Sequence, residues 1–288
     1  MLRYFIFILL PILFSLSCSR EAENSVVSSD GVTISYEVRG KGDPTIIFVH
    51  GWTNTREVWN EQIAHFSRKY RTIAMDLPGT GRSGNNRSLW SMQAFADDVT
   101  AIVRKEKLDQ IVLVGFSMGG PVVVEAASRL PDETIGVVLV EAIPDPYQKI
   151  PEEMIPTLDS LYMDLVSNLN NEKLLELGFY KKNPEENFAR VMEMYPKDAS
   201  RTGWRESQLA FWNWINMDCT DALKRLEDPL VSINSDLLPT DVEAFRRLVP
   251  IYEAKIMTGN GHLVFWDDPE GFHQNLEASI QGFIQLQP

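Results

Sequence analysis

The 288-residue chain is acidic, because 40 aspartates and glutamates against 27 lysines and arginines give a formal net charge of -13. Binding to nucleic acid phosphates requires a clustered basic surface, so this balance argues against a nucleic acid as partner. The length suits a single α/β domain that carries an insertion, and it is ample for a large buried core.

The chain begins with the pattern of a secretory signal, in which one positive charge precedes an apolar run that ends in small residues. The run Tyr4–Leu16 is short for a membrane span and contains Pro11, so cleavage is expected. Its end, SLSC, resembles the lipobox of bacterial lipoproteins, in which the cysteine is acylated and becomes the first mature residue. The resemblance implies a signal peptide over residues 1–17, a lipid on Cys18 and a membrane-anchored protein of the cell envelope. An ordinary cleaved signal that contains a cysteine is the alternative.

A polar segment without periodicity follows over residues 18–30, which predicts a tether. The sequence has two cysteines. With Cys18 acylated, Cys219 has no disulfide partner, so the core alone must stabilise the fold.

From Val32 onward, short apolar runs alternate with amphipathic segments. The run Val32–Val38 alternates like a half-exposed strand, whereas the later runs are nearly continuous, as expected for strands buried on both faces. These later runs are Thr45–Val49, Thr72–Met75, Ile111–Gly115 and Ile135–Glu141. The clearest helical pattern between them is Trp90–Leu108. This order predicts an α/β fold with a doubly wound, mostly parallel sheet.

The alternation stops after Glu141. Residues 143–226 are helix-prone, are interrupted by prolines and contain no strand-like run, so we predict that they form a helical insertion. Two further strands and a closing helix are expected at Pro229–Asn234, Tyr252–Met257 and Pro269–Leu286. The core would then consist of residues 31–142 and 227–288.

The sequence GFSMGG places Ser117 between a buried strand and a helix, with Gly115 and Gly119 two positions to either side. A nucleophile elbow requires this context, because the sharp strand–turn–helix connection strains the serine backbone and leaves room only for small residues beside it. Ser117 is therefore the candidate nucleophile.

A serine nucleophile needs a base, and His262 is the best placed of the four histidines. It follows the last predicted strand, and because the carboxyl ends of parallel strands open on one crevice, it can reach Ser117. His50 also ends a strand, but the glycine and tryptophan after it suit the shaping of a loop. His65 and His273 lie on helical segments, where surface or packing roles are expected.

The base in turn needs a carboxylate that fixes its tautomer and stabilises the imidazolium. Glu141 and Asp236 both stand at strand ends, so either can serve, and the other then has a structural role such as capping. An oxyanion hole is expected from the backbone N–H groups of Trp52 and Met118. This chemistry requires neither a metal nor a cofactor.

Four segments resemble, in order, motifs of the α/β-hydrolase superfamily. HGW is similar to the oxyanion loop, DLPGTGRS to a D-x-x-G-x-G-x-S segment, GFSMGG to the nucleophile elbow and GNGHLVFWDDPEGF to the histidine loop. The resemblance covers nearly the whole chain after the tether. It implies a serine hydrolase fold in which the helical insertion, residues 143–226, forms a lid after the sixth strand.

The acid segment departs from the usual pattern of this superfamily, a G-x-x-D run after the seventh strand. Here Ser235 stands at the glycine position and Leu238 at that of the aspartate. Members that resemble haloalkane dehalogenases take the acid from the end of the sixth strand, to which VLVEAI is similar, so we favour Glu141 over Asp236. The dehalogenases and epoxide hydrolases use an aspartate nucleophile, so the serine at position 117 excludes both of these reactions.

The expected reaction is acyl transfer from a small hydrophobic ester to water, with Ser117 as nucleophile and His262 as base. Aromatic lid residues suit a small apolar acyl or alkyl group, or equally a lid core: Trp204, Phe211, Trp212 and Trp214. Two alternatives stay open. The same triad can hydrolyse the carbon–carbon bond of a diketone-type substrate, and a lipid-anchored protein can use the scaffold for binding alone.

Overall fold

The computed structural model describes residues 24–194 and 201–287. The predicted signal peptide and Cys18 lie outside the described residues. Within these ranges, no helix is long and apolar enough to cross a membrane.

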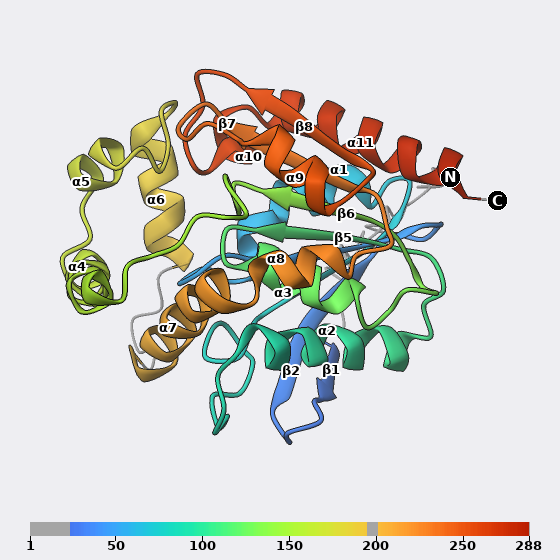
Figure 1. Ribbon diagram of the computed structural model, residues 1–288, viewed down its shortest axis with the longest axis horizontal. Helices are drawn as coiled ribbons and strands as arrows, with labels where there is room; N and C mark the ends of the chain where they lie inside the picture. The colour runs from blue at the N-terminus through green and yellow to red at the C-terminus, as the bar shows by residue number, and fades with distance from the viewer. Residues whose placement is uncertain (1–23, 195–200, 288) are drawn as a thin grey trace, which may run out of the picture.

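An eight-stranded sheet forms the centre of the molecule (Figure 1). In chain order the strands are Asn24–Val27 (β1), Thr33–Arg39 (β2), Thr45–Val49 (β3), Arg71–Met75 (β4), Ile111–Phe116 (β5), Thr134–Val140 (β6), Leu230–Ser235 (β7) and Tyr252–Met257 (β8). Their order in the sheet is β1-β2-β4-β3-β5-β6-β7-β8. β2 pairs antiparallel with β1 and β4, and the other neighbours are parallel. The predicted doubly wound, mostly parallel sheet is confirmed.

The strand β1 lies inside the segment predicted as a tether. Its Val26 pairs with Ile34 of β2, and its residues alternate between half-buried and exposed. The sequence pattern does not predict a strand here, because NSVV has only two apolar residues and no alternation beyond them. Pairing with β2, rather than local pattern, defines this element.

Alternate residues of the central strands pack on opposite faces of the sheet. Ile47 and Val49 of β3 join one core cluster, whereas Ile46 and Phe48 join the other. The first face is covered by α2 (Met92–Glu106), α3 (Gly119–Ala127), α8 (Cys219–Lys224) and α9 (Val242–Leu248). The second is covered by the 3-10 helix η1 (Arg56–Trp59), α1 (Asn60–Phe66), α10 (Val264–Asp267) and α11 (Pro269–Leu286). The strands are thus buried on both sides, which explains their continuous apolar runs.

The described residues between β6 and β7, called the insertion below, contain helices and no strand. Besides α8 these are the 3-10 helix η2 (Glu152–Met154), α4 (Ile155–Ser167), α5 (Asn171–Glu176), α6 (Pro184–Met194) and α7 (Arg201–Met217). In Figure 1, α4, α5 and α6 lie at one end of the molecule, and α7 and α8 lead back to the core. Cys219 is a free, buried thiol, and burial raises its pKa to about 12.

Candidate active site

The carboxyl ends of five neighbouring strands stand at one edge of the sheet. Val49 of β3 pairs with Gly115 of β5, and Phe116 pairs with Val140 of β6. The register continues through β7 to β8, where Ser235 pairs with Met257. The loops after these ends carry the residues singled out from the sequence: Trp52, Ser117, Met118, Glu141, Asp236 and His262.

Ser117 occupies a strained turn between β5 and α3. Its φ is +50°, in the left-handed region, at a typical cost of about 1–3 kcal/mol for a residue other than glycine. Its N–H donates to the Val140 carbonyl at 2.9 Å. A Cβ at Gly115 would overlap the Gly119 carbonyl oxygen, and one at Gly119 would lie 2.5 Å from the Val49 carbonyl oxygen. The turn therefore requires small residues at the two positions that the motif predicts.

Glu141 is held against His262 from two sides. The Oε2 atom of Glu141 lies 3.3 Å from His262 Nδ1, and its Oε1 accepts a hydrogen bond from the Ser235 N–H. The Glu141 backbone also has a left-handed φ, +49°, and its N–H donates to Asn234 Oδ1 at 3.0 Å. The Glu141 side chain is only 8% exposed. With Nδ1 directed at this carboxylate, Nε2 of His262 is the nitrogen left to act as a base.

Asp236 points elsewhere. Its Oδ1 accepts a hydrogen bond from the Gly259 N–H at 3.0 Å and lies 3.5 Å from Lys181 Nζ. The Gly259 hydrogen bond, with Lys181 nearby, lowers the pKa of this carboxyl. The Asp236 side chain is 44% exposed. The structure therefore brings Glu141, and not Asp236, to His262, and Asp236 instead contacts the turn that follows β8.

Two backbone amides beside Ser117 suit an oxyanion hole. A Cβ at Gly51 would lie 3.1 Å from the Ser117 Cβ, so the loop after β3 passes close to the serine. Within residues 24–194 and 201–287, the N–H groups of Trp52 and Met118 donate no hydrogen bond. The Trp52 indole N–H donates to the Trp204 carbonyl at 2.7 Å, which ties this loop to α7.

His50 holds the same loop, in agreement with the sequence analysis. The ring is fully buried, with Nδ1 2.7 Å from the Gly51 carbonyl oxygen, and its Nε2 accepts from the Leu77 N–H at 3.0 Å. Burial lowers the pKa of His50, so the neutral ring with a proton on Nδ1 is favoured. Asp76 accepts from the backbone N–H groups of Arg56 and Arg82, at 2.8 and 3.1 Å. The segment DLPGTGRS thus has a structural role beside the site.

Aromatic rings surround His262 and Trp52. The Phe116 and Phe179 rings lie 4.9 and 5.8 Å from the His262 ring, centroid to centroid. Tyr162 of α4 lies 5.6 Å from Trp52. Neither Phe179 nor Tyr162 was singled out from the sequence, because both lie in the insertion, where no motif marks a residue that reaches the site.

The four aromatic residues predicted for the lid divide between two environments. The Trp212 ring lies 5.5 Å from Tyr162, at the side of the insertion that faces Trp52. Trp214 is instead part of the core with Phe211 packed beside it, and its indole N–H donates to the buried Glu125 at 2.8 Å. Trp204 is also buried. The lid-core interpretation therefore holds for Trp214.

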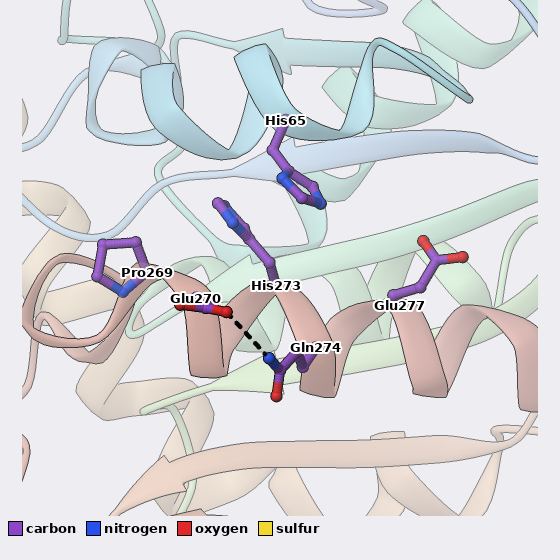
Figure 2. A pocket seen from close by; sticks show the side chains of 6 residues that line it. All are labelled: His65, Pro269, Glu270, His273, Gln274 and Glu277. Carbon is purple, nitrogen blue, oxygen red and sulfur yellow. Dashed lines mark hydrogen bonds between the residues drawn. The ribbon is translucent and has the colours of Figure 1, made fainter.

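His65 and His273 stack on each other outside this group of residues. Their ring centroids are 3.9 Å apart, between α1 and α11 (Figure 2). Burial lowers the pKa of His273 to about 4, and the neighbouring His65 and Arg68 act in the same direction. A shallow hollow around the pair is completed by Pro269, Glu270, Gln274 and Glu277. The packing role expected for these two histidines agrees with this arrangement.

A parallel sheet with a serine elbow after β5 and a histidine after β8 defines the class of the α/β hydrolases. Residues 46–274 match the model of the Alpha/beta hydrolase family, and the chain belongs to this family. It is 28% identical over 276 residues to a bifunctional esterase/perhydrolase from Acinetobacter calcoaceticus, covering 89% of this chain and 99% of the relative. It is 27% identical over 275 residues to a non-heme chloroperoxidase from Kitasatospora aureofaciens, covering 86% of this chain and 95% of that relative. An esterase from Exiguobacterium antarcticum has a similar fold, with a TM-score of 0.78 and 21% identity. The match covers 90% of this chain and 100% of the esterase.

Proposed function

We propose that the protein is a serine hydrolase that cleaves small hydrophobic esters through an acyl-enzyme. The observation that carries the proposal is the contact between Glu141 and His262 Nδ1 next to the strained elbow of Ser117. A binding protein has no need to keep a serine and a glutamate in left-handed backbone conformations beside an oriented imidazole. The relative from Acinetobacter calcoaceticus, a bifunctional esterase/perhydrolase, supports an ester as the substrate.

The proposed reaction has two steps. Ser117 Oγ attacks the ester carbonyl while His262 Nε2 takes its proton, and the N–H groups of Trp52 and Met118 receive the developing oxyanion. The protonated His262, stabilised by Glu141, then gives the proton to the leaving alcohol. Water attacks the acyl-enzyme in the second step, again with His262 as base, and the acid is released.

The aromatic side chains near the site favour small apolar acyl groups. Trp52, Tyr162 and Trp212 form a chain of ring contacts from the loop after β3 into the insertion. Such rings give apolar contact area but occupy the space that a long acyl chain would need.

A series of p-nitrophenyl esters tests this proposal. We expect kcat/KM to be highest for acetate or butyrate and to fall by at least about tenfold toward laurate, because the rings of Trp52, Tyr162 and Trp212 occupy the space that a longer chain would need. A preference for laurate would contradict the small-acyl part of the proposal. Turnover of a 1,3-diketone with no ester hydrolysis would assign the triad to carbon–carbon bond cleavage instead.

We further propose that the chain is exported and anchored by a lipid on Cys18. The support is the signal-like N-terminus with its SLSC tail. Cells grown with a clickable fatty acid are expected to label the wild-type protein and to leave Cys18→Ala unlabelled. Cys219→Ala is the control, because Cys219 is buried and should not change acylation. A wild-type protein that acquires no label would contradict the anchor.

A further inference from the structure

The base must reach across the sheet to act on Ser117. Ser117 follows β5 and His262 follows β8, with β6 and β7 between them. Three strand spacings of about 4.8 Å separate these strands by roughly 14 Å. His262 follows the end of β8 by five residues. A loop of this kind needs fixed contacts if its side chain is to keep one position.

Asp267, the last residue of α10, supplies contacts of this kind. Its side chain is buried, and its Oδ2 accepts hydrogen bonds from the N–H groups of Gly261 and Lys181, both at 2.7 Å. Its Oδ1 accepts from the Lys182 N–H at 3.0 Å and from Asn187 Nδ2 at 3.4 Å. The carboxylate therefore joins the residue before His262 to a segment of the insertion about 80 residues earlier in the chain.

Backbone contacts extend this junction to His262 itself. The His262 N–H donates to the Gly178 carbonyl at 2.8 Å, and the Leu263 N–H donates to the Phe179 carbonyl at 2.7 Å. A Cβ at Gly261 would lie 2.6 Å from Tyr180 Cα, so the two backbones are in direct contact there. The Phe179 ring packs edge-on against the imidazole.

We propose that Asp267 is a positioning residue that holds the His262 loop on the segment 178–182 of the insertion. The inference rests on the proposed function, in which His262 is the base for Ser117. Asp267 does not touch the reacting atoms. Its partners among the described residues are N–H groups, and removing the acceptor leaves the buried Gly261 donor and the partly buried Lys181 and Lys182 donors unpaired. The loop would then shift, and the imidazole with it.

The test compares Asp267→Asn and Asp267→Ala with the wild-type protein. Asparagine keeps the shape of the aspartate, so Asp267→Asn is the variant expected to fold. Its NH₂ group, however, faces one pair of N–H donors and cannot accept their hydrogen bonds. We expect kcat for a p-nitrophenyl ester, and the rate of Ser117 labelling by a fluorophosphonate, to fall by about 10- to 100-fold per folded molecule. KM should change by less than about twofold, because the contacts that bind the substrate and the transition state equally well are not affected.

Asp98→Asn is the matched control. Asp98, on α2, is likewise buried, but it forms an ion pair with Arg87 at 2.7 Å. This variant should lower the unfolding temperature without changing the labelling rate. Asp267 variants that fold and keep the wild-type kcat and labelling rate, or that raise KM alone, would overturn the positioning role. A wild-type protein that neither reacts with the fluorophosphonate nor hydrolyses esters would instead overturn the proposed function.

Discussion

Ser117→Ala is expected to abolish labelling by a fluorophosphonate and to lower kcat for ester hydrolysis by about 10⁴- to 10⁶-fold. In the proposed mechanism, this hydroxyl is the protein group that forms a bond to the substrate carbon. The backbone N–H groups of Trp52 and Met118 would still polarise a bound ester, so a small residual rate over water should remain. Labelling followed by intact-mass measurement, together with steady-state hydrolysis, gives both quantities.

Ser128→Ala is the control for this substitution. Ser128 is the C-cap of the same helix, α3, and its hydroxyl donates to the Glu125 carbonyl, so the change tests general effects on the helix. It should leave labelling and turnover unchanged. A wild-type protein without label, or a Ser117→Ala variant that labels equally well, would favour the binding-protein alternative.

The fold could be predicted from the sequence wherever burial alone determines an element. Strands covered on both faces need continuous apolar runs, and Thr45–Val49, which is buried along its whole length, has the predicted bounds. The helix predicted over Trp90–Leu108 is shorter, because Ser91 caps its N-terminus and Lys107 ends it in a left-handed conformation. A serine before a helix is visible in the sequence, but it does not by itself show that the flanking apolar residues Trp90 and Leu108 lie outside the helix.

The residues around the site were predictable only where chemistry and local geometry coincide. The turn at Ser117 has no room for side chains at Gly115 and Gly119, so the two glycines of the motif indicate the turn as well as the nucleophile. The partner of His262 depends instead on the register of β6 and β7, which places Asn234 and Ser235 around Glu141. The position of Asp267 depends on the path of the insertion, which no periodicity in the sequence encodes.

Glu141→Gln is expected to lower kcat by about 10³- to 10⁴-fold, with little change in the fold. The glutamate oxygens face two donors, the Ser235 N–H and the Nδ1–H of His262. A glutamine has one oxygen for both, so its NH₂ group must face one of them. With the oxygen kept on Ser235, His262 would turn Nδ1 into an acceptor and carry its proton on Nε2, the wrong tautomer for a base.

Asp236→Asn supplies the comparison, because it changes the other candidate acid. This carboxylate is exposed and contacts Gly259 and Lys181, so its loss should lower kcat by no more than about threefold. Measuring kcat and fluorophosphonate labelling for both variants separates the two acids. A large loss in Asp236→Asn with near-normal turnover in Glu141→Gln would show that the acid follows β7, and that the Glu141–His262 contact is structural. A large loss in Glu141→Gln alone, with unchanged KM, would place the acid at the end of β6, since the tautomer of His262 affects the chemical step and not the binding of the ester.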